Sequence, residues 1–145
     1  ALAVPARRNV DDPRFKRGEK LFLQAQCAVC HVPEMRTGAL SGLPQINDQV
    51  FRAYTDLLLH DMGDDLADHR PDFKASGRDW RTPPLWAIGL SETVSGSSAM
   101  LHDGRARNVT EAILWHGGEA SASREVFRGM SKDDRETLLR FLDSI

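Results

Sequence analysis

The feature that most constrains this chain is the placement of its only two cysteines. They lie at Cys27 and Cys30, and His31 follows directly. The stretch Cys27-Ala28-Val29-Cys30-His31 has the C-x-x-C-H pattern of covalent c-type haem attachment. The two intervening residues let one helical turn bring both sulfurs to the haem, where each forms a thioether with one vinyl group. The adjacent histidine is then the expected proximal ligand of the iron. The pattern therefore predicts one covalent haem c.

Two other uses of the cysteine pair compete with haem attachment. A thioredoxin-like pair follows a strand in a βαβ unit, whereas residues 12–26 have the pattern of a helix. A zinc site needs further ligands at finger-like spacing. The other histidines are scattered along the chain, at His60, His69, His102 and His116.

Length and composition narrow the class of protein. The chain has 145 residues, 41% of them apolar, and a formal net charge of −2. This predicts a single packed domain without the basic charge of a nucleic-acid-binding protein and without an apolar run long enough to span a bilayer. We expect residues 1–11 to be a linker or the severed end of a longer chain, and residues 12–145 to form the haem domain. Covalent haem attachment takes place outside the bacterial cytoplasm, so we expect a periplasmic protein.

Helix signals are clearest near the two ends of the chain. Asp12 is a suitable N-cap with Pro13 at the first helical position, and a second helix is expected from Ser131 onward. Gly18 interrupts the first apolar stripe, which suggests a close packing contact there. The expected apolar stripes are Phe15, Gly18, Leu21, Phe22 and Ala25 in the first helix, and Leu138, Phe141, Leu142 and Ile145 in the last.

The middle of the chain has weaker signals. Asn108 and Glu111 have the spacing of a capping box, which predicts a short helix ended by Gly117 and Gly118. The apolar run 50–60 is expected to be buried, and its pattern does not decide between helix and extended chain. The prolines at positions 83 and 84 exclude regular helix over 81–86. Loops are expected over 32–50, 63–77 and 91–98. These elements predict an all-α fold resembling cytochrome c, with short helices and long loops around one haem and with the first and last helices crossing.

The sixth ligand of the iron decides the function. Met35 is too near His31 in sequence to reach the opposite face, and Met130 is placed to anchor the last helix. Met100 is as consistent with core packing as with ligation. Met62 and His116 remain as equally supported distal ligands.

Five stretches, taken together in this order, resemble the C-terminal haem domain of the di-haem oxidoreductase family. That family is related to the bacterial di-haem cytochrome c peroxidases. The stretches are residues 27–33 (CAVCHVP), 54–63 (YTDLLLHDMG), 80–86 (WRTPPLW), 101–106 (LHDGRA) and 112–120 (AILWHGGEA).

The resemblance implies a distal ligand and a partner. His116 occupies the position of the axial methionine of the peroxidases, which favours His116 over Met62 and a bis-histidine haem of lower potential. The family normally carries a second haem domain N-terminal to this one. The chain is therefore expected to be a fragment or a stand-alone relative, with a second haem domain or a redox protein as its partner.

Candidate residues for the rest of the haem pocket follow from the charge of the propionates. Arg81, Trp86 and Tyr54 are expected as donors, together with Trp80 or Arg105. His102 and Asp103 are expected to form a turn near the haem edge.

The sequence therefore leaves two alternative predictions of function. The first is one-electron transfer through a six-coordinate haem. The alternative is a peroxidase or oxidoreductase centre with an open or labile sixth position, in which His102 with Arg105, or Glu119, would assist as acid or base.

Overall fold

The computed structural model describes residues 4–40 and 42–145. Helical residues make up 43% and extended residues 10%, the latter in two small antiparallel sheets. The all-α prediction is therefore wrong, and the chain is a mixed helix and sheet protein. The prediction failed because the strands are only two or three residues long and carry no alternating pattern.

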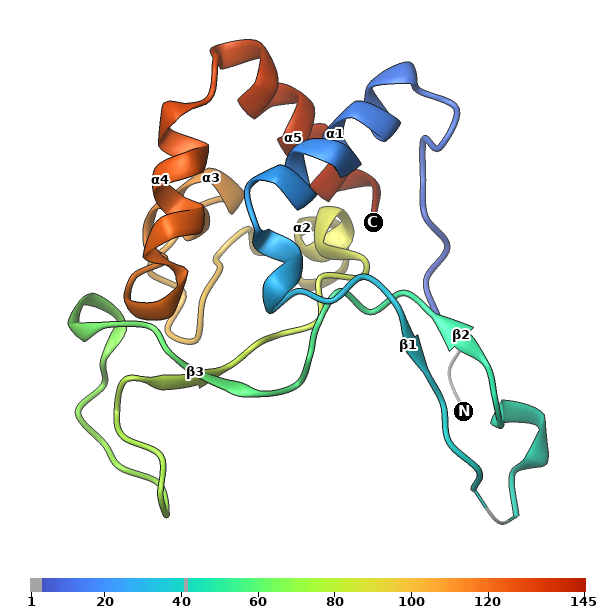
Figure 1. The fold of residues 1–145 in the computed structure, drawn as a ribbon, viewed down its shortest axis with the longest axis horizontal. Coiled ribbons are helices and arrows are strands. Elements are labelled where there is room, and N and C mark those ends of the chain that lie inside the picture. Colours follow the sequence, from blue (N-terminus) through green and yellow to red (C-terminus); the bar gives the residue numbers. More distant parts are fainter. Residues whose placement is uncertain (1–3, 41) are drawn as a thin grey trace.

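Two helices from opposite ends of the chain pack together, as expected. Helix α1 spans Pro13–Gln24 and α5 spans Lys132–Ser144, and they lie side by side in the upper part of Figure 1. Both predicted caps are present. The Asp12 carboxylate accepts from the Arg14 amide at 2.9 Å, and the Ser131 hydroxyl accepts from the Asp134 amide at 3.1 Å.

The main core lies between these two helices. Its aromatic centre consists of Phe15, Phe22, Tyr54 and Phe141, whose rings meet edge-on or tilted at centroid distances of 5.3–6.0 Å. All nine residues of the two predicted apolar stripes are buried, which confirms them: Phe15, Gly18, Leu21, Phe22, Ala25, Leu138, Phe141, Leu142 and Ile145. Gly18 is the point of closest approach, because a Cβ there would lie 2.5 Å from the Phe141 Cβ.

Three shorter α-helices complete the helical part. Helix α3, Val109–Leu114, begins at the predicted cap, where the Asn108 side chain accepts from the Glu111 amide. Helix α2, Ser91–Ser95, lies in a segment expected to be a loop, and α4, Ser121–Gly129, was not predicted. Single 3-10 turns occur at Cys27–Val29, Pro44–Ile46, Asp64–Leu66, Ile88–Leu90 and Gly118–Ala120.

Two β-hairpins extend from the helical body. Strands β1 (Met35–Arg36) and β2 (Val50–Phe51) form an arm that projects away from the helices in Figure 1. Strands β3 (Leu59–Asp61) and β4 (Asp79–Arg81) pair in the register His60 opposite Trp80. The expected loop over 32–50 is thus partly a hairpin. The run 50–60 is extended, with a buried centre at 53–55 and exposed leucines at 57–59.

Membrane insertion by a helix finds no support in the described part of the chain, where none of the helices has the length and hydrophobicity to cross a bilayer.

Candidate functional site

The two cysteines lie on the turn that follows α1. The 3-10 turn Cys27–Val29 brings them to the edge of the core, with Cys27 and Ala28 packed against it. Burial raises the pKa of the Cys27 thiol to about 11, and burial also raises the pKa of Cys30. Reactive cysteines of redox proteins and thiolate metal ligands have lowered pKa values. Burial thus keeps both thiols protonated at neutral pH, unlike the low-pKa thiol of a thioredoxin-like redox pair.

His31 is oriented by the backbone of a distant segment. Its Nδ1–H donates to the Tyr54 carbonyl at 3.0 Å, and the Thr55 amide donates to the Val32 carbonyl at 3.1 Å. Tyr54 has a φ of +55°, an unfavourable conformation for an aromatic residue, while its ring is 1% exposed in the core. Packing of the ring therefore holds the carbonyl that directs the imidazole.

Burial also controls the charge of His31. It lowers the pKa of the imidazole to about 4, so the ring is neutral at pH 7. With Nδ1 protonated and donating, Nε2 has a free lone pair. A neutral imidazole is the form that binds a metal, and a backbone carbonyl on the other nitrogen is the usual partner of such a ligand.

His116 follows α3 and has the same arrangement. Its Nδ1–H donates to the Ala112 carbonyl, four residues earlier, at 2.7 Å. Burial lowers the pKa of this imidazole as well. The chain then turns away through Gly117 and Gly118, as the sequence predicted.

The two imidazoles lie close together. Their ring centroids are 6.5 Å apart, and the ring planes are inclined by 43°. A histidine nitrogen lies about 2 Å from a bound transition metal and its ring centroid about 1 Å farther back, so two imidazoles on opposite sides of one metal have centroids roughly 6 Å apart. The separation of His31 and His116, and their donor set, thus fit a six-coordinate iron next to the cysteine turn.

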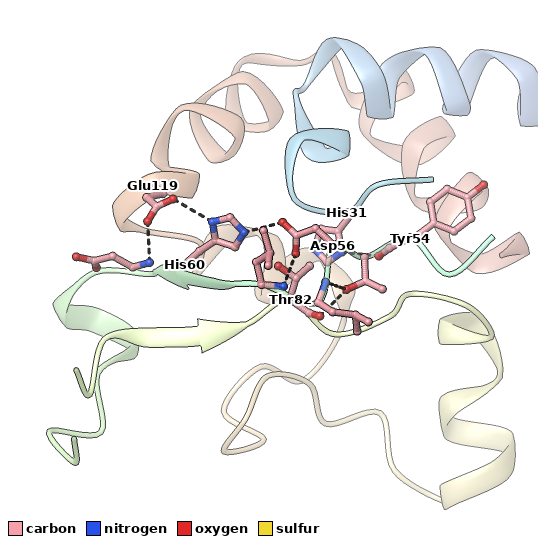
Figure 2. A network of polar contacts seen from close by, with 10 residues as sticks. His31, Tyr54, Asp56, His60, Thr82 and Glu119 are labelled. Carbon is pink, nitrogen blue, oxygen red and sulfur yellow. Dashed lines mark hydrogen bonds and ion pairs between the residues drawn. The ribbon is translucent and has the colours of Figure 1, made fainter. Parts of the chain in front are cut away.

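A polar network lies beside this pair of imidazoles. In Figure 2, His60 lies between Asp56 and Glu119. His60 Nε2 is 2.8 Å from Asp56 Oδ2, and His60 Nδ1 is 3.0 Å from Glu119 Oε2. The other oxygen of Glu119 accepts from the Asp61 amide at 3.0 Å.

The charge of His60 follows from its partners. Both ring nitrogens face carboxylates, so both must donate, which requires the imidazolium form. The hydrogen bonds to Glu119 and Asp56 accordingly raise the pKa of His60. Cys30, Asp56 and His60 place one donor atom each within 4.8 Å of the others. Because Asp56 already occupies Nε2 of His60, this cluster is a hydrogen-bonded pair beside a thiol, and it does not present an open set of metal ligands.

A buried threonine fixes the segment that carries Asp56. The Thr55 hydroxyl donates to the Thr82 carbonyl at 2.7 Å and accepts from the Leu57 amide at 2.9 Å. The Thr82 amide returns a hydrogen bond to the Leu58 carbonyl. These bonds join the segment after Tyr54 to the end of β4.

The two methionines considered as ligands are placed differently. The backbone of Met62 packs against the turn formed by Gly117 and Gly118, called here the diglycine turn. A Cβ on Gly117 would be 2.7 Å from the Met62 carbonyl oxygen. Met100 forms an isolated β-bridge with Ala106.

The predicted pocket residues make contacts of several kinds. Tyr54 contributes its carbonyl, and its ring lies in the core. Trp86 packs near Phe51, and Arg81 is exposed on β4. His102 stacks on Trp80 with a centroid distance of 3.5 Å.

Sequence reasoning missed the joint role of Asp56, His60 and Glu119. Asp56 and His60 are four residues apart but lie on extended chain, and Glu119 is 59 residues beyond His60. No local pattern connects them. The only signal was the presence of an acidic residue directly after the diglycine.

Comparison with known proteins gives one match. A family model described as "Di-haem oxidoreductase, putative peroxidase" matches residues 1–145, the whole chain. Neither the curated proteins nor the solved structures contain a match.

Proposed function

The chain belongs to the di-haem oxidoreductase family. We propose that it binds one haem c covalently and transfers one electron at a time. Histidine would fill both axial positions of the iron. The observation that carries the proposal is a pair of half-buried imidazoles with ring centroids 6.5 Å apart. Burial lowers the pKa of both, and the Nδ1 atom of each donates to a backbone carbonyl.

The roles of the residues follow from their positions. Cys27 and Cys30 would hold the porphyrin through thioethers, and His31 and His116 would be the axial ligands. A bound haem would supply the iron that takes up and releases the electron. The chain keeps both imidazoles neutral and correctly oriented, and it holds them on separate segments of the fold.

Filled axial positions support electron transfer over reaction with a small molecule. Two rigidly held ligands need little rearrangement between oxidation states. His31 is held by the strained Tyr54 backbone and His116 by the end of a helix.

Spectra of the haem-loaded protein test the proposal. We expect low-spin ferric EPR signals of bis-imidazole type and no near-infrared methionine band. His116→Ala should convert the ferric haem to a form that binds cyanide readily, whereas Met62→Leu should leave the spectrum unchanged. A methionine band in the wild type that disappears in Met62→Leu would assign the distal position to Met62 and overturn the proposal.

A second candidate function rests on the family description, which names a peroxidase. It requires a haem whose sixth position opens to bind peroxide. A high-spin ferric signal from the wild type at neutral pH would favour this function over electron transfer.

We further propose a partner and a compartment. The chain has one C-x-x-C-H motif and its family is di-haem, so a second haem domain or a separate redox protein would exchange the electron. Covalent attachment would place the protein in the periplasm. Cell fractionation and a haem stain of the fractions test the location.

A further inference from the structure

We infer that His60 is a positioning residue. With Asp56 and Glu119 it forms a hydrogen-bonded link, called here the strut, which fixes the distance between the segment that orients His31 and the turn that follows His116. The inference rests on the proposed bis-histidine haem. It assigns a role to Asp56, His60 and Glu119, none of which is a proposed thioether or axial residue.

The strut begins at the segment that orients His31. The Tyr54 carbonyl accepts from His31, and Asp56 follows two residues later. The Asp56 and His60 side chains are only 12% and 16% exposed, and they meet at 2.8 Å. Since hydrogen bonds between charged groups are stronger when water is excluded, this is the firm end of the strut.

The strut ends at the segment that carries His116. Glu119 lies three residues after His116 and accepts from His60 with one oxygen and from the Asp61 amide with the other. Both oxygens of one carboxylate therefore hold the turn after the distal histidine onto β3. The Glu119 side chain is 57% exposed, so this end is the weaker one.

Backbone contact supports the same junction. A Cβ on Gly118 would lie 2.1 Å from the Asp61 carbonyl oxygen, and a Cβ on Gly63 would lie 2.9 Å from the Gly118 amide nitrogen. The turn and the end of β3 thus meet without an intervening side chain. In Figure 2, the side chains of Asp56, His60 and Glu119 form a continuous connection above β3.

The strut predicts a specific effect on ligand exchange. Carbon monoxide can bind the ferrous haem only after His116 leaves the iron, so its binding rate reports how firmly His116 is held. Removing the strut should let the turn move and raise that rate. A purely structural role would lower stability without changing the rate.

The test uses four haem-loaded variants. We expect Glu119→Ala and His60→Phe each to raise the rate of carbon monoxide binding at least fivefold over wild type. Glu119→Gln keeps the acceptor for the Asp61 amide and should give a smaller rise, and it provides the measurement if the alanine variant does not assemble. Glu125→Ala removes a carboxylate on α4 that pairs only with Arg124 and Arg128 among the described residues, and it should leave the rate unchanged.

A double variant makes the test sharper. If Glu119 acts through His60, combining Glu119→Ala with His60→Phe should give no larger rise than the stronger single change. Rates within twofold of wild type in both single variants, or effects that multiply in the double variant, would overturn the strut. A wild type without bis-imidazole ligation would instead overturn the proposed function, whatever the variants do.

Discussion

Replacing Gly18 by alanine should destabilise the protein, although alanine is the better helix former. A Cβ at this position would lie 2.5 Å from the Phe141 Cβ and 2.7 Å from the Thr137 carbonyl oxygen. Carbon atoms pack favourably at about 3.5–4.0 Å. Neither obstructing atom can rotate away, because one is a backbone oxygen and the other is attached directly to the backbone. Helices α1 and α5 must therefore separate by about 1 Å.

The magnitude follows from two opposing effects. Overpacking of a close contact costs about 1–3 kcal/mol, and a rigid obstruction belongs at the upper end of that range. Alanine recovers roughly 0.5–1 kcal/mol of helix propensity relative to glycine. The net loss should be about 2 kcal/mol. For a chain of this size, about 3 °C per kcal/mol gives a decrease of about 6 °C in Tm.

Urea unfolding of the haem-loaded protein, followed by far-UV circular dichroism, measures the loss. Gly129→Ala is the matched control, because Gly129 ends α4, has no atom within 4 Å of its added Cβ and is not in the left-handed region. That variant should be as stable as wild type or more stable by up to about 1 kcal/mol. If Gly18→Ala were as stable as Gly129→Ala, the close contact between α1 and α5 would be refuted.

Three further outcomes are expected. The Ser131 hydroxyl and Arg17 lower the pKa of Asp134. The ionised carboxylate therefore stabilises the fold fully above pH 3.8, its ordinary pKa, and this stabilisation is lost as the pH falls through the lower pKa of the folded state. Asp134→Asn should flatten the acid limb of a plot of Tm against pH, and an unchanged slope would contradict this. Thr55→Val leaves the Thr82 carbonyl and the Leu57 amide without their hydrogen bonds, and it should lower the free energy of unfolding in urea by about 1–3 kcal/mol. Thr55→Ser keeps the hydroxyl and should lower it less. Equal losses in the two variants would show that the hydroxyl is unimportant. Gly118→Ala meets a facing carbonyl at a φ of +51° and should lower the Tm by at least about 5 °C, and an unchanged Tm would show that the turn has room for a Cβ.

The elements predicted correctly from sequence are those fixed by local signals. Helices α1 and α5 have caps and regular apolar stripes, so the sequence contains both their ends and their buried faces. The end of α3 was marked by two glycines. The C-x-x-C-H motif is local too, and the haem attachment that it indicates stays a prediction.

The elements that were missed depend on contacts between distant segments. Strands of two or three residues have no periodicity of their own, and they exist because residues 35–36 meet 50–51 and residues 59–61 meet 79–81. The same is true of the site. The Tyr54 carbonyl and the Glu119 carboxylate could be assigned only once their partners, 23 and 59 residues away, were in place.

The contact between α1 and α5 also has a consequence for the order of assembly. It joins a helix near the beginning of the described chain to one at its end, so α1 acquires its main packing partner only when residues 132–144 have docked. Contacts of such wide sequence separation form late, because the cost of closing the loop comes before the gain. During that interval the cysteine turn, which directly follows α1, is not yet fixed against a core. The proposed attachment of haem to Cys27 and Cys30 would therefore be easiest before the last helix docks.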